Sequence, residues 1–191
     1  MNILLIGPPG AGKGTQGERL AERLGIAHLA TGDLLRAEVD QGSPIGEEVA
    51  GLMSRGELVP DEVIIRLIMP RVIAAAADGG YLLDGFPRSV DQATEARKLA
   101  ESGGAAPDAV IYLDAPRDEL VRRILARAEI EGRADDNPDT VRTRLKVFDD
   151  ATRPLIDHYR ERGLLHVIDA AQDEDAVTDA ILAVLADIDR N

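Results

Sequence analysis

The sequence predicts an α/β fold in which one parallel, doubly wound sheet is covered by helices. Short apolar runs alternate along the chain with stretches of helical periodicity, which is the pattern of successive β–α–β units. The apolar runs are rich in leucine or β-branched residues and end at glycine, proline or charged residues, as buried strands do. With 191 residues and 45% apolar composition, the chain can bury the core of one globular unit without disulfides or metals.

Five segments are predicted to form the strands. In chain order they are residues 2–6, 28–30, 81–84, 109–114 and 165–169. Helices are expected between them, and Asn137 can cap one that starts at Pro138, where the missing N–H costs nothing. This helix and the last one each present an apolar face, formed by Val141, Leu145 and Phe148 in the former and by Val177, Ile181, Val184, Leu185 and Ile188 in the latter.

Two segments depart from this alternation. Residues 31–60 hold two predicted helices in succession, punctuated by Gly42-Ser43-Pro44 and by Gly56, with no strand between them. Residues 128–136 are polar and aperiodic. Neither segment could bury a core of its own, so both are predicted to be insertions that extend from the sheet rather than independent domains.

The strongest functional signal is the glycine-rich turn at residues 7–15, Gly-Pro-Pro-Gly-Ala-Gly-Lys-Gly-Thr. It follows the first predicted strand and opens a helix, which is the context in which such a loop binds phosphate. Glycines let backbone N–H groups turn toward an anion, and the helix N-terminus adds partial positive charge. Lys13 is then placed to reach the β- and γ-phosphates. The generic pattern has Ser or Thr directly after the lysine, whereas here Gly14 stands there and Thr15 follows.

An acid at the end of a predicted strand adds to this signal. Asp84 closes the run at residues 81–84, and a carboxylate in that position can orient Mg²⁺ and its waters. Together with the loop it predicts a site for a nucleoside triphosphate with Mg²⁺.

The acceptor of a phosphoryl group is expected to be another phosphate. None of His28, His158 and His166 stands in a context that demands a catalytic base. A phosphate oxygen, with a second pKa of about 6, is already ionised at neutral pH and needs positioning rather than deprotonation. Arginine suits that task because its planar guanidinium group can donate two hydrogen bonds to one phosphate. Only three of the 22 basic residues are lysines, although a general compositional bias explains that excess of arginine equally well.

Three motifs together make the chain similar to the adenylate kinases. Residues 7–16, GPPGAGKGTQ, resemble the signature loop of that family, and residues 31–36, TGDLLR, and 84–88, DGFPR, resemble its other two motifs. The likeness runs along the whole chain. It implies a P-loop NTPase-type three-layer sandwich with a five-stranded parallel sheet, a helical NMP-binding insertion and a short lid. The implied divisions are a core of residues 1–30, 61–125 and 137–191, an insertion of residues 31–60 and a lid of residues 126–136.

The resemblance implies reversible phosphoryl transfer from MgATP to AMP, giving two ADP. The residues expected to bind ATP are Gly10, Ala11, Gly12, Lys13, Gly14, Thr15, Arg123, Arg127 and Gln172. Those expected to bind AMP are Thr31, Arg36, Met53, Leu58, Val59, Gly85, Arg88, Gln92, Arg133 and Arg144. The side chains expected to spread the transition-state charge are Lys13, Arg88, Arg123, Arg127, Arg133 and Arg144. Thr15 and Asp84 are expected to serve the Mg²⁺ shell, mostly through water.

The predicted lid is short. Asp135 and Asp136 match lid carboxylates that hydrogen-bond the ATP ribose or pair with arginines, and Ala126 stands where glycine is common at the hinge. Some relatives hold zinc in the lid through cysteines, and this chain has none, so no such zinc site is expected.

Charge and hydropathy limit the expected partners and location. With 35 acidic and 22 basic residues the net charge is −13, so the bulk surface is not expected to bind nucleic acid or anionic membranes. No apolar run approaches the roughly 18 residues of a membrane span, and the start of the chain lacks the basic region of a signal peptide. We therefore expect a cytoplasmic protein, and the resemblance implies a monomer.

Three other functions compete with this interpretation. A UMP/CMP kinase would share the scaffold, but such kinases typically carry a small residue where Thr31 stands and Asn where Gln92 stands. A nucleotide-gated binding module would leave Arg36 and Arg88 unexplained, and an acidic structural protein would leave the whole loop unexplained.

Overall fold

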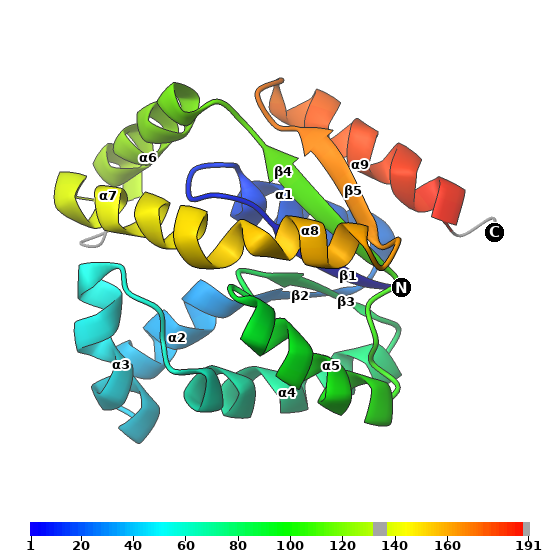
Figure 1. The fold of residues 1–191 in the computed structure, drawn as a ribbon, viewed down its shortest axis with the longest axis horizontal. Coiled ribbons are helices and arrows are strands. Elements are labelled where there is room, and N and C mark those ends of the chain that lie inside the picture. The colour runs from blue at the N-terminus through cyan, green and yellow to red at the C-terminus, as the bar shows by residue number, and fades with distance from the viewer. Residues whose placement is uncertain (132–136, 189–191) are drawn as a thin grey trace.

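The computed structural model describes residues 1–131 and 137–188. Over these residues it contains a five-stranded, all-parallel sheet in the order β2-β3-β1-β4-β5 (Figure 1). The strands are β1 (Asn2–Ile6), β2 (Ala27–Ala30), β3 (Tyr81–Asp84), β4 (Ala109–Asp114) and β5 (Leu165–Asp169). The predicted α/β fold and its five strands are confirmed, with β2 starting one residue earlier than expected.

Helices connect the strands and cover both faces of the sheet. They are α1 (Lys13–Leu24), α2 (Thr31–Asp40), α3 (Pro44–Arg55), α4 (Asp61–Ala77), α5 (Val90–Ser102), α6 (Arg117–Glu131), α7 (Pro138–Val147), α8 (Pro154–Arg160) and α9 (Glu174–Ile188). A π-helical turn, η1 (Phe148–Thr152), joins α7 to α8. As expected, Asn137 caps α7, its side chain accepting a 3.0 Å hydrogen bond from the Thr140 N–H.

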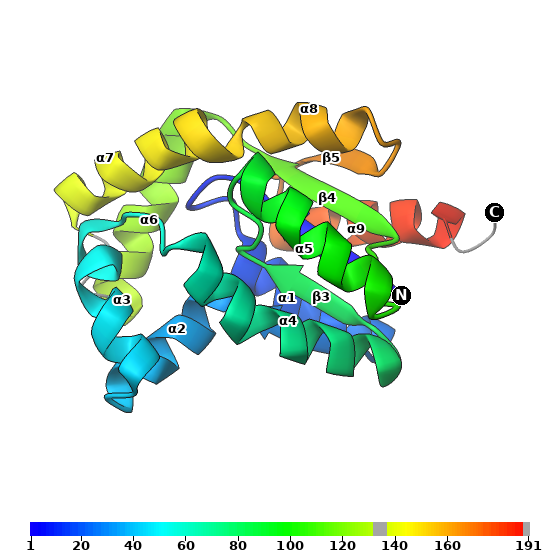
Figure 2. The ribbon, with the colours of Figure 1, turned by 60° about the horizontal axis from the view of Figure 1, so that its bottom comes forward.

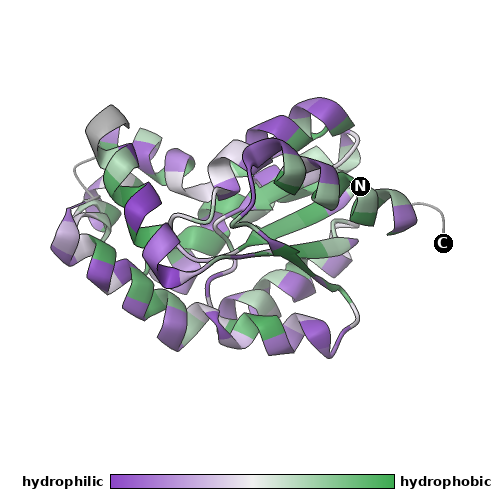
Figure 3. Ribbon diagram, turned by 90° about the horizontal axis from the view of Figure 1, so that it is seen from above, coloured by the Kyte–Doolittle hydropathy of each residue, from purple (hydrophilic) through white to green (hydrophobic). Residues whose placement is uncertain are grey.

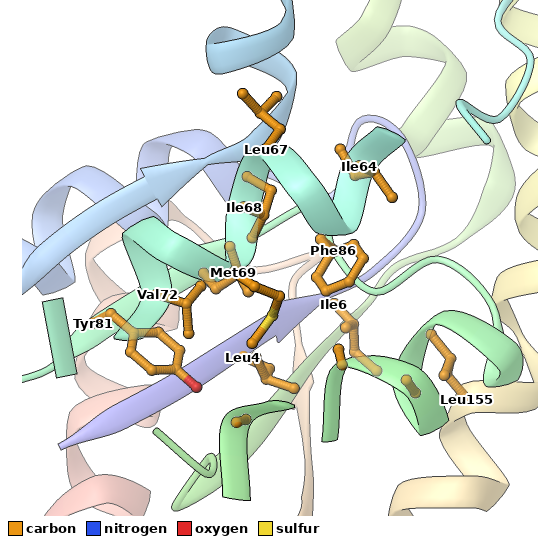
Figure 4. Close-up of a cluster of buried hydrophobic side chains, with 14 of the residues drawn as sticks. Leu4, Ile6, Ile64, Leu67, Ile68, Met69, Val72, Tyr81, Phe86 and Leu155 are labelled. Atoms are coloured by element: carbon orange, nitrogen blue, oxygen red, sulfur yellow. The ribbon is translucent and has the colours of Figure 1, made fainter. Parts of the chain in front are cut away.

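The sheet is apolar on both faces because helices pack on each side of it. In β1, Ile3 and Leu5 belong to one buried cluster, with side chains from α1, α6 and α9. Leu4 and Ile6 belong to a second cluster, with side chains from α4, α5 and α8. Figure 2 shows α4 and α5 lying side by side. In Figure 3 the strands are mostly apolar, whereas polar and apolar residues alternate along the helices that surround them. In Figure 4, Phe86 lies between Ile64 of α4 and Ile6.

The segment of residues 31–60 forms two helices in succession, as predicted. The Ser43 side chain caps α3 by accepting a 3.0 Å hydrogen bond from the Gly46 N–H, and Pro44 occupies the first helical turn. Helices α2 and α3 pack against each other, and α3 also contacts α7. The segment therefore projects from the sheet toward α7 (Figure 1).

The polar and aperiodic segment at residues 128–136 begins inside a helix, because α6 continues to Glu131. Alanine, arginine and glutamate are strong helix formers, so a polar segment rich in them can be helical without apolar periodicity. The part of the expected lid at residues 126–131 thus belongs to α6. Residues 132–136 lie outside the described residues.

Candidate nucleotide site

The glycine-rich turn lies between the carboxyl end of β1 and the N-terminus of α1. Gly10 and Gly12 have φ angles of 85° and 87°, a region that L side chains rarely adopt. A Cβ added at Gly10 would lie 2.6 Å from the Leu120 carbonyl oxygen in α6. The loop can therefore follow this path close to α6 only with glycine at that position.

Lys13 begins α1, and its ammonium group lies back over the loop. Nζ donates hydrogen bonds to the carbonyl oxygens of Gly7 (3.0 Å) and Pro8 (3.1 Å). Burial lowers the Lys13 pKa to about 8 against the opposing effect of Asp84, and Arg88, Arg144 and Arg127 lower it further. The ammonium group thus lies among other cations.

Arg88 follows β3 and is fixed by three hydrogen bonds. Its Nε donates to the Gly85 carbonyl (2.8 Å), and its backbone N–H donates to Gln92 Oε1 (2.8 Å). Its own carbonyl accepts a 2.7 Å hydrogen bond from the Thr152 hydroxyl. Burial, and then the nearby Arg144, lower the Arg88 pKa, so this guanidinium is also buried among like charges.

These cations share one cleft with a volume of about 490 Å³. The glycine-rich turn forms part of its wall, and the predicted arginines that line it are Arg36, Arg88, Arg123, Arg127 and Arg144. They come from α2, the turn after β3, α6 and α7, so the fold brings them together from distant parts of the sequence. Arg36 pairs with Asp33, and Arg123 pairs with Glu119 at 2.6 Å. The cleft is a local concentration of positive charge in an acidic chain, which suits a polyphosphate.

Asp84 lies at the end of β3 in the same cleft. Burial raises its pKa, against the opposing charges of Lys13, His28 and Arg88. One of its carboxylate oxygens, Oδ1, is buried without a hydrogen-bond partner. A buried acceptor without a partner is unfavourable, so the atom is suited to a group that arrives with the substrate.

A second cavity of about 500 Å³ shares Gly12, Thr15 and Arg123 with the cleft and continues from it. Its wall includes Ala11 and the exposed Gln172, whose Nε2 donates to the Asp169 carbonyl at 3.1 Å. The residues predicted to hold ATP among those described therefore surround two adjoining cavities.

A small pocket of about 20 Å³ opens beside Gly85 and Arg88. The expected AMP residues that line it are Thr31, Leu58, Val59, Gly85, Arg88 and Gln92. Thr31 is 1% exposed, and its hydroxyl oxygen is buried without a hydrogen-bond partner. A volume of that size holds about one water molecule, so the walls must separate before a base can enter.

Not every predicted site residue lies in these cavities. Met53 is half-buried against the apolar cluster around α4 rather than in the lining of the small pocket. The predicted roles of Arg133, Asp135 and Asp136 fall outside the described residues.

Sequence reasoning missed two residues that hold the predicted ones in place. Asp61 accepts a hydrogen bond from the Gln92 side chain, and Thr152 donates one to Arg88. The only sequence signal at Asp61 is an acid in the first turn of a helix, which ordinarily indicates helix stability. Thr152 carries no signal, because its partner is 64 positions away in the sequence.

Comparison with known proteins agrees with this geometry. Residues 5–164 match the adenylate kinase family. The chain is 44% identical to an adenylate kinase of Stenotrophomonas maltophilia, over 97% of this chain and 99% of the relative. It is 47% identical to one of Parvibaculum lavamentivorans, over 97% and 92%, and 45% identical to one of Thermus thermophilus, over 96% of each. The chain belongs to the adenylate kinase family.

Proposed function

We propose that the cationic cleft carries out the reaction of this family, the reversible transfer of the γ-phosphoryl group of MgATP to AMP, giving two ADP. The observation that supports it best is the convergence of Lys13 and five arginines on one cleft beside the phosphate-binding loop. Two polyanions must approach within bonding distance for this reaction, and their mutual repulsion has to be offset. Burial, with a smaller contribution from neighbouring cations, lowers the pKa of both Lys13 and Arg88, so bound anions would favour the charged form of each group.

We assign the triphosphate of ATP to the loop and Lys13, with its nucleoside in the second cavity. There the backbone near Gln172 would read the adenine edge, and the Arg123 guanidinium would stack on the base. Arg123, which lines that cavity, is held by hydrogen bonds to Glu119 (2.6 Å) and to the Ala170 carbonyl (2.8 Å).

We assign the AMP phosphate to Arg36 and Arg88, and its base to the pocket of Thr31 and Gln92. Both of those side chains are buried, and the Thr31 hydroxyl has no hydrogen-bond partner in the structure. The pocket is flanked by Leu58 and Val59 from the segment of residues 31–60. Entry of the base would therefore move this segment, which fits the proposed role of an insertion that closes over AMP.

The residues present fit a Mg²⁺ ion. Oδ1 of Asp84 is the buried, unpartnered acceptor in the cleft, and Thr15 is exposed to the same space. Asp84 and Thr15 would hold the ion mostly through its waters. When bound with ATP, Mg²⁺ neutralises charge on the β- and γ-phosphates.

No general base is needed. The attacking AMP oxygen is ionised at neutral pH, so the side chains need only position it in line and stabilise the charge of the transferring group. We assign that stabilisation to Lys13, Arg88, Arg123, Arg127, Arg133 and Arg144. Closure of the segments at residues 31–60 and 126–136, with Asp135 and Asp136 in the lid, would exclude water and prevent ATP hydrolysis.

Among the described residues, no helix is long and apolar enough to cross a membrane. A cytoplasmic location, a monomeric state and the absence of nucleic-acid partners remain predictions from composition and from the family.

The test is a coupled assay of ADP formation from ATP with AMP, CMP or UMP as acceptor. We expect AMP to give the highest kcat/KM, because Thr31 and Gln92 match the residues that read adenine. The Lys13→Met variant, with its fold checked by thermal unfolding, should lose activity by orders of magnitude. An equal or reversed ranking of the three acceptors would indicate a pyrimidine nucleotide kinase instead.

A further inference from the structure

Gln92 is buried, and both ends of its side-chain amide are held by the protein. It is 2% exposed. Its Oε1 accepts the Arg88 backbone N–H at 2.8 Å, and its Nε2 donates to Asp61 Oδ1 at 2.8 Å. Gln92 also lines the small pocket that we assign to the base of AMP.

The two partners determine which way the amide faces. A peptide N–H can only donate a hydrogen bond, and an ionised carboxylate can only accept one. A reversed amide would direct its NH₂ group at the Arg88 N–H and its oxygen at the Asp61 carboxylate, losing both hydrogen bonds. The orientation of this amide is therefore fixed by chemistry rather than chosen between two equivalent fits.

An amide fixed in this way has one remaining acceptor site on Oε1 and one remaining N–H on Nε2. The edge of adenine offers the complement, with the exocyclic amino group as a donor beside the ring N1 as an acceptor. A 6-oxopurine such as hypoxanthine offers the reverse, with O6 as an acceptor beside N1–H as a donor. Both contacts would then be repulsive, and the remaining acceptor site and N–H of the amide would be left unpaired.

We propose that Asp61 is a specificity-determining positioning residue, which holds the Gln92 amide in the orientation that accepts a 6-aminopurine nucleotide and rejects a 6-oxopurine nucleotide. This inference rests on the proposed function, since it assumes that the pocket beside Gln92 takes the acceptor base. It goes further in assigning the discrimination to a residue that need not touch the substrate.

Asp61 has a competing structural role, which the experiment must separate. It stands in the first turn of α4, where an acid favourably complements the partial positive charge of the helix terminus. Glu62 is the next residue in the same turn, and it is exposed. Glu62→Gln therefore removes a charge from the same helix terminus as Asp61→Asn does, and serves as the matched control.

The experiment measures kcat/KM for AMP and for IMP, with MgATP as donor, in the wild-type chain and both variants. The wild type should strongly prefer AMP. In Asp61→Asn the ratio of kcat/KM for AMP to kcat/KM for IMP should fall by about tenfold. The asparagine amide can donate as well as accept a hydrogen bond, so it can also pair with the oxygen of a reversed Gln92 amide. Glu62→Gln should keep the wild-type ratio. A ratio measured on one preparation does not depend on the fraction of folded protein.

Three results would overturn the inference: equal use of AMP and IMP by the wild type, a parallel loss of both activities in Asp61→Asn, or the same change of ratio in Glu62→Gln. Failure of the wild type to phosphorylate AMP at all is a different result, because it contradicts the proposed function itself.

Discussion

The hydroxyl of Thr152 donates a 2.7 Å hydrogen bond to the backbone carbonyl of Arg88. Thr152 is buried in the π-helical turn η1, which directly follows the helix that carries Arg144. The bond therefore connects η1, which continues from α7, to the turn after β3. Thr152 thus links the segment that carries Arg144 to the turn that carries Arg88. We therefore expect a substitution at Thr152 to alter the position of Arg88.

Thr152→Val should lower both stability and activity. Valine keeps the shape but removes the donor, and a buried carbonyl that loses its partner costs about 1 kcal/mol. We expect a lower Tm and a several-fold rise in KM for AMP, as the Arg88 turn loosens. Thr143→Val is the control, because the Thr143 hydroxyl bonds to Asp139 within α7 (3.1 Å). Equal KM values in the two variants would show that Thr152 does not position Arg88.

Gly56→Ala should impair catalysis more than Gly42→Ala. Both glycines have a left-handed φ, 71° and 61°, so alanine strains the backbone at either position. A Cβ at Gly56 would also lie 2.7 Å from Cγ of Arg144, whereas a Cβ at Gly42 would meet no atom within 4 Å. We expect a lower Tm in both variants, with the larger loss in Gly56→Ala, and a lower kcat only in Gly56→Ala, measured with saturating ATP and AMP. If both variants retain the wild-type kcat, the contact of residue 56 with Arg144 has no role in the reaction.

The activity should depend on pH through Lys13. Its pKa in the free protein is about 8, so the ammonium group loses its proton as the pH rises above that value. The kcat/KM for MgATP should therefore fall as the pH rises through about 8, while kcat should fall only at higher pH, because bound phosphates favour the charged amine. A kcat/KM that stays constant up to about pH 10 would contradict the role of Lys13.

Folding stability should respond to Lys13 in the opposite direction. The unfolded chain holds this proton up to its ordinary pKa of 10.5, so between about pH 8 and 10.5 it binds more protons than the folded chain at this group. The contribution of Lys13 to stability therefore becomes more favourable as the pH rises through that range. Comparison of Tm against pH for the wild type and Lys13→Met isolates this contribution.

The strands and the loop could be predicted because their signals are local. Each strand is a short apolar run, and the loop at residues 7–15 combines glycines, a lysine and a following helix in one stretch. The end of α6 at Glu131 could not be read from the sequence, because the polar residues 128–131 show no apolar periodicity.

The supporting contacts of the site could not be predicted, since each one joins residues far apart in the sequence. Gln92 and Asp61 are 31 positions apart, and Arg88 and Thr152 are 64 apart. The motifs alone identified Arg88 and Gln92, but not the residues that orient them. The roles of the predicted site residues themselves stay predictions until variants are measured.

Replacing Arg88 by lysine tests the central proposal most directly. The Nε of Arg88 donates to Gly85, which fixes the plane of the guanidinium, and lysine has neither that donor nor a fork to grip a phosphate. Arg88→Lys should lose most of its kcat and bind AMP more weakly, while its KM for MgATP stays near the wild-type value. Arg97→Lys, at an exposed residue paired with Glu101, should behave as the wild type. A wild-type rate in Arg88→Lys would contradict the assignment of this arginine as the clamp on the acceptor phosphate.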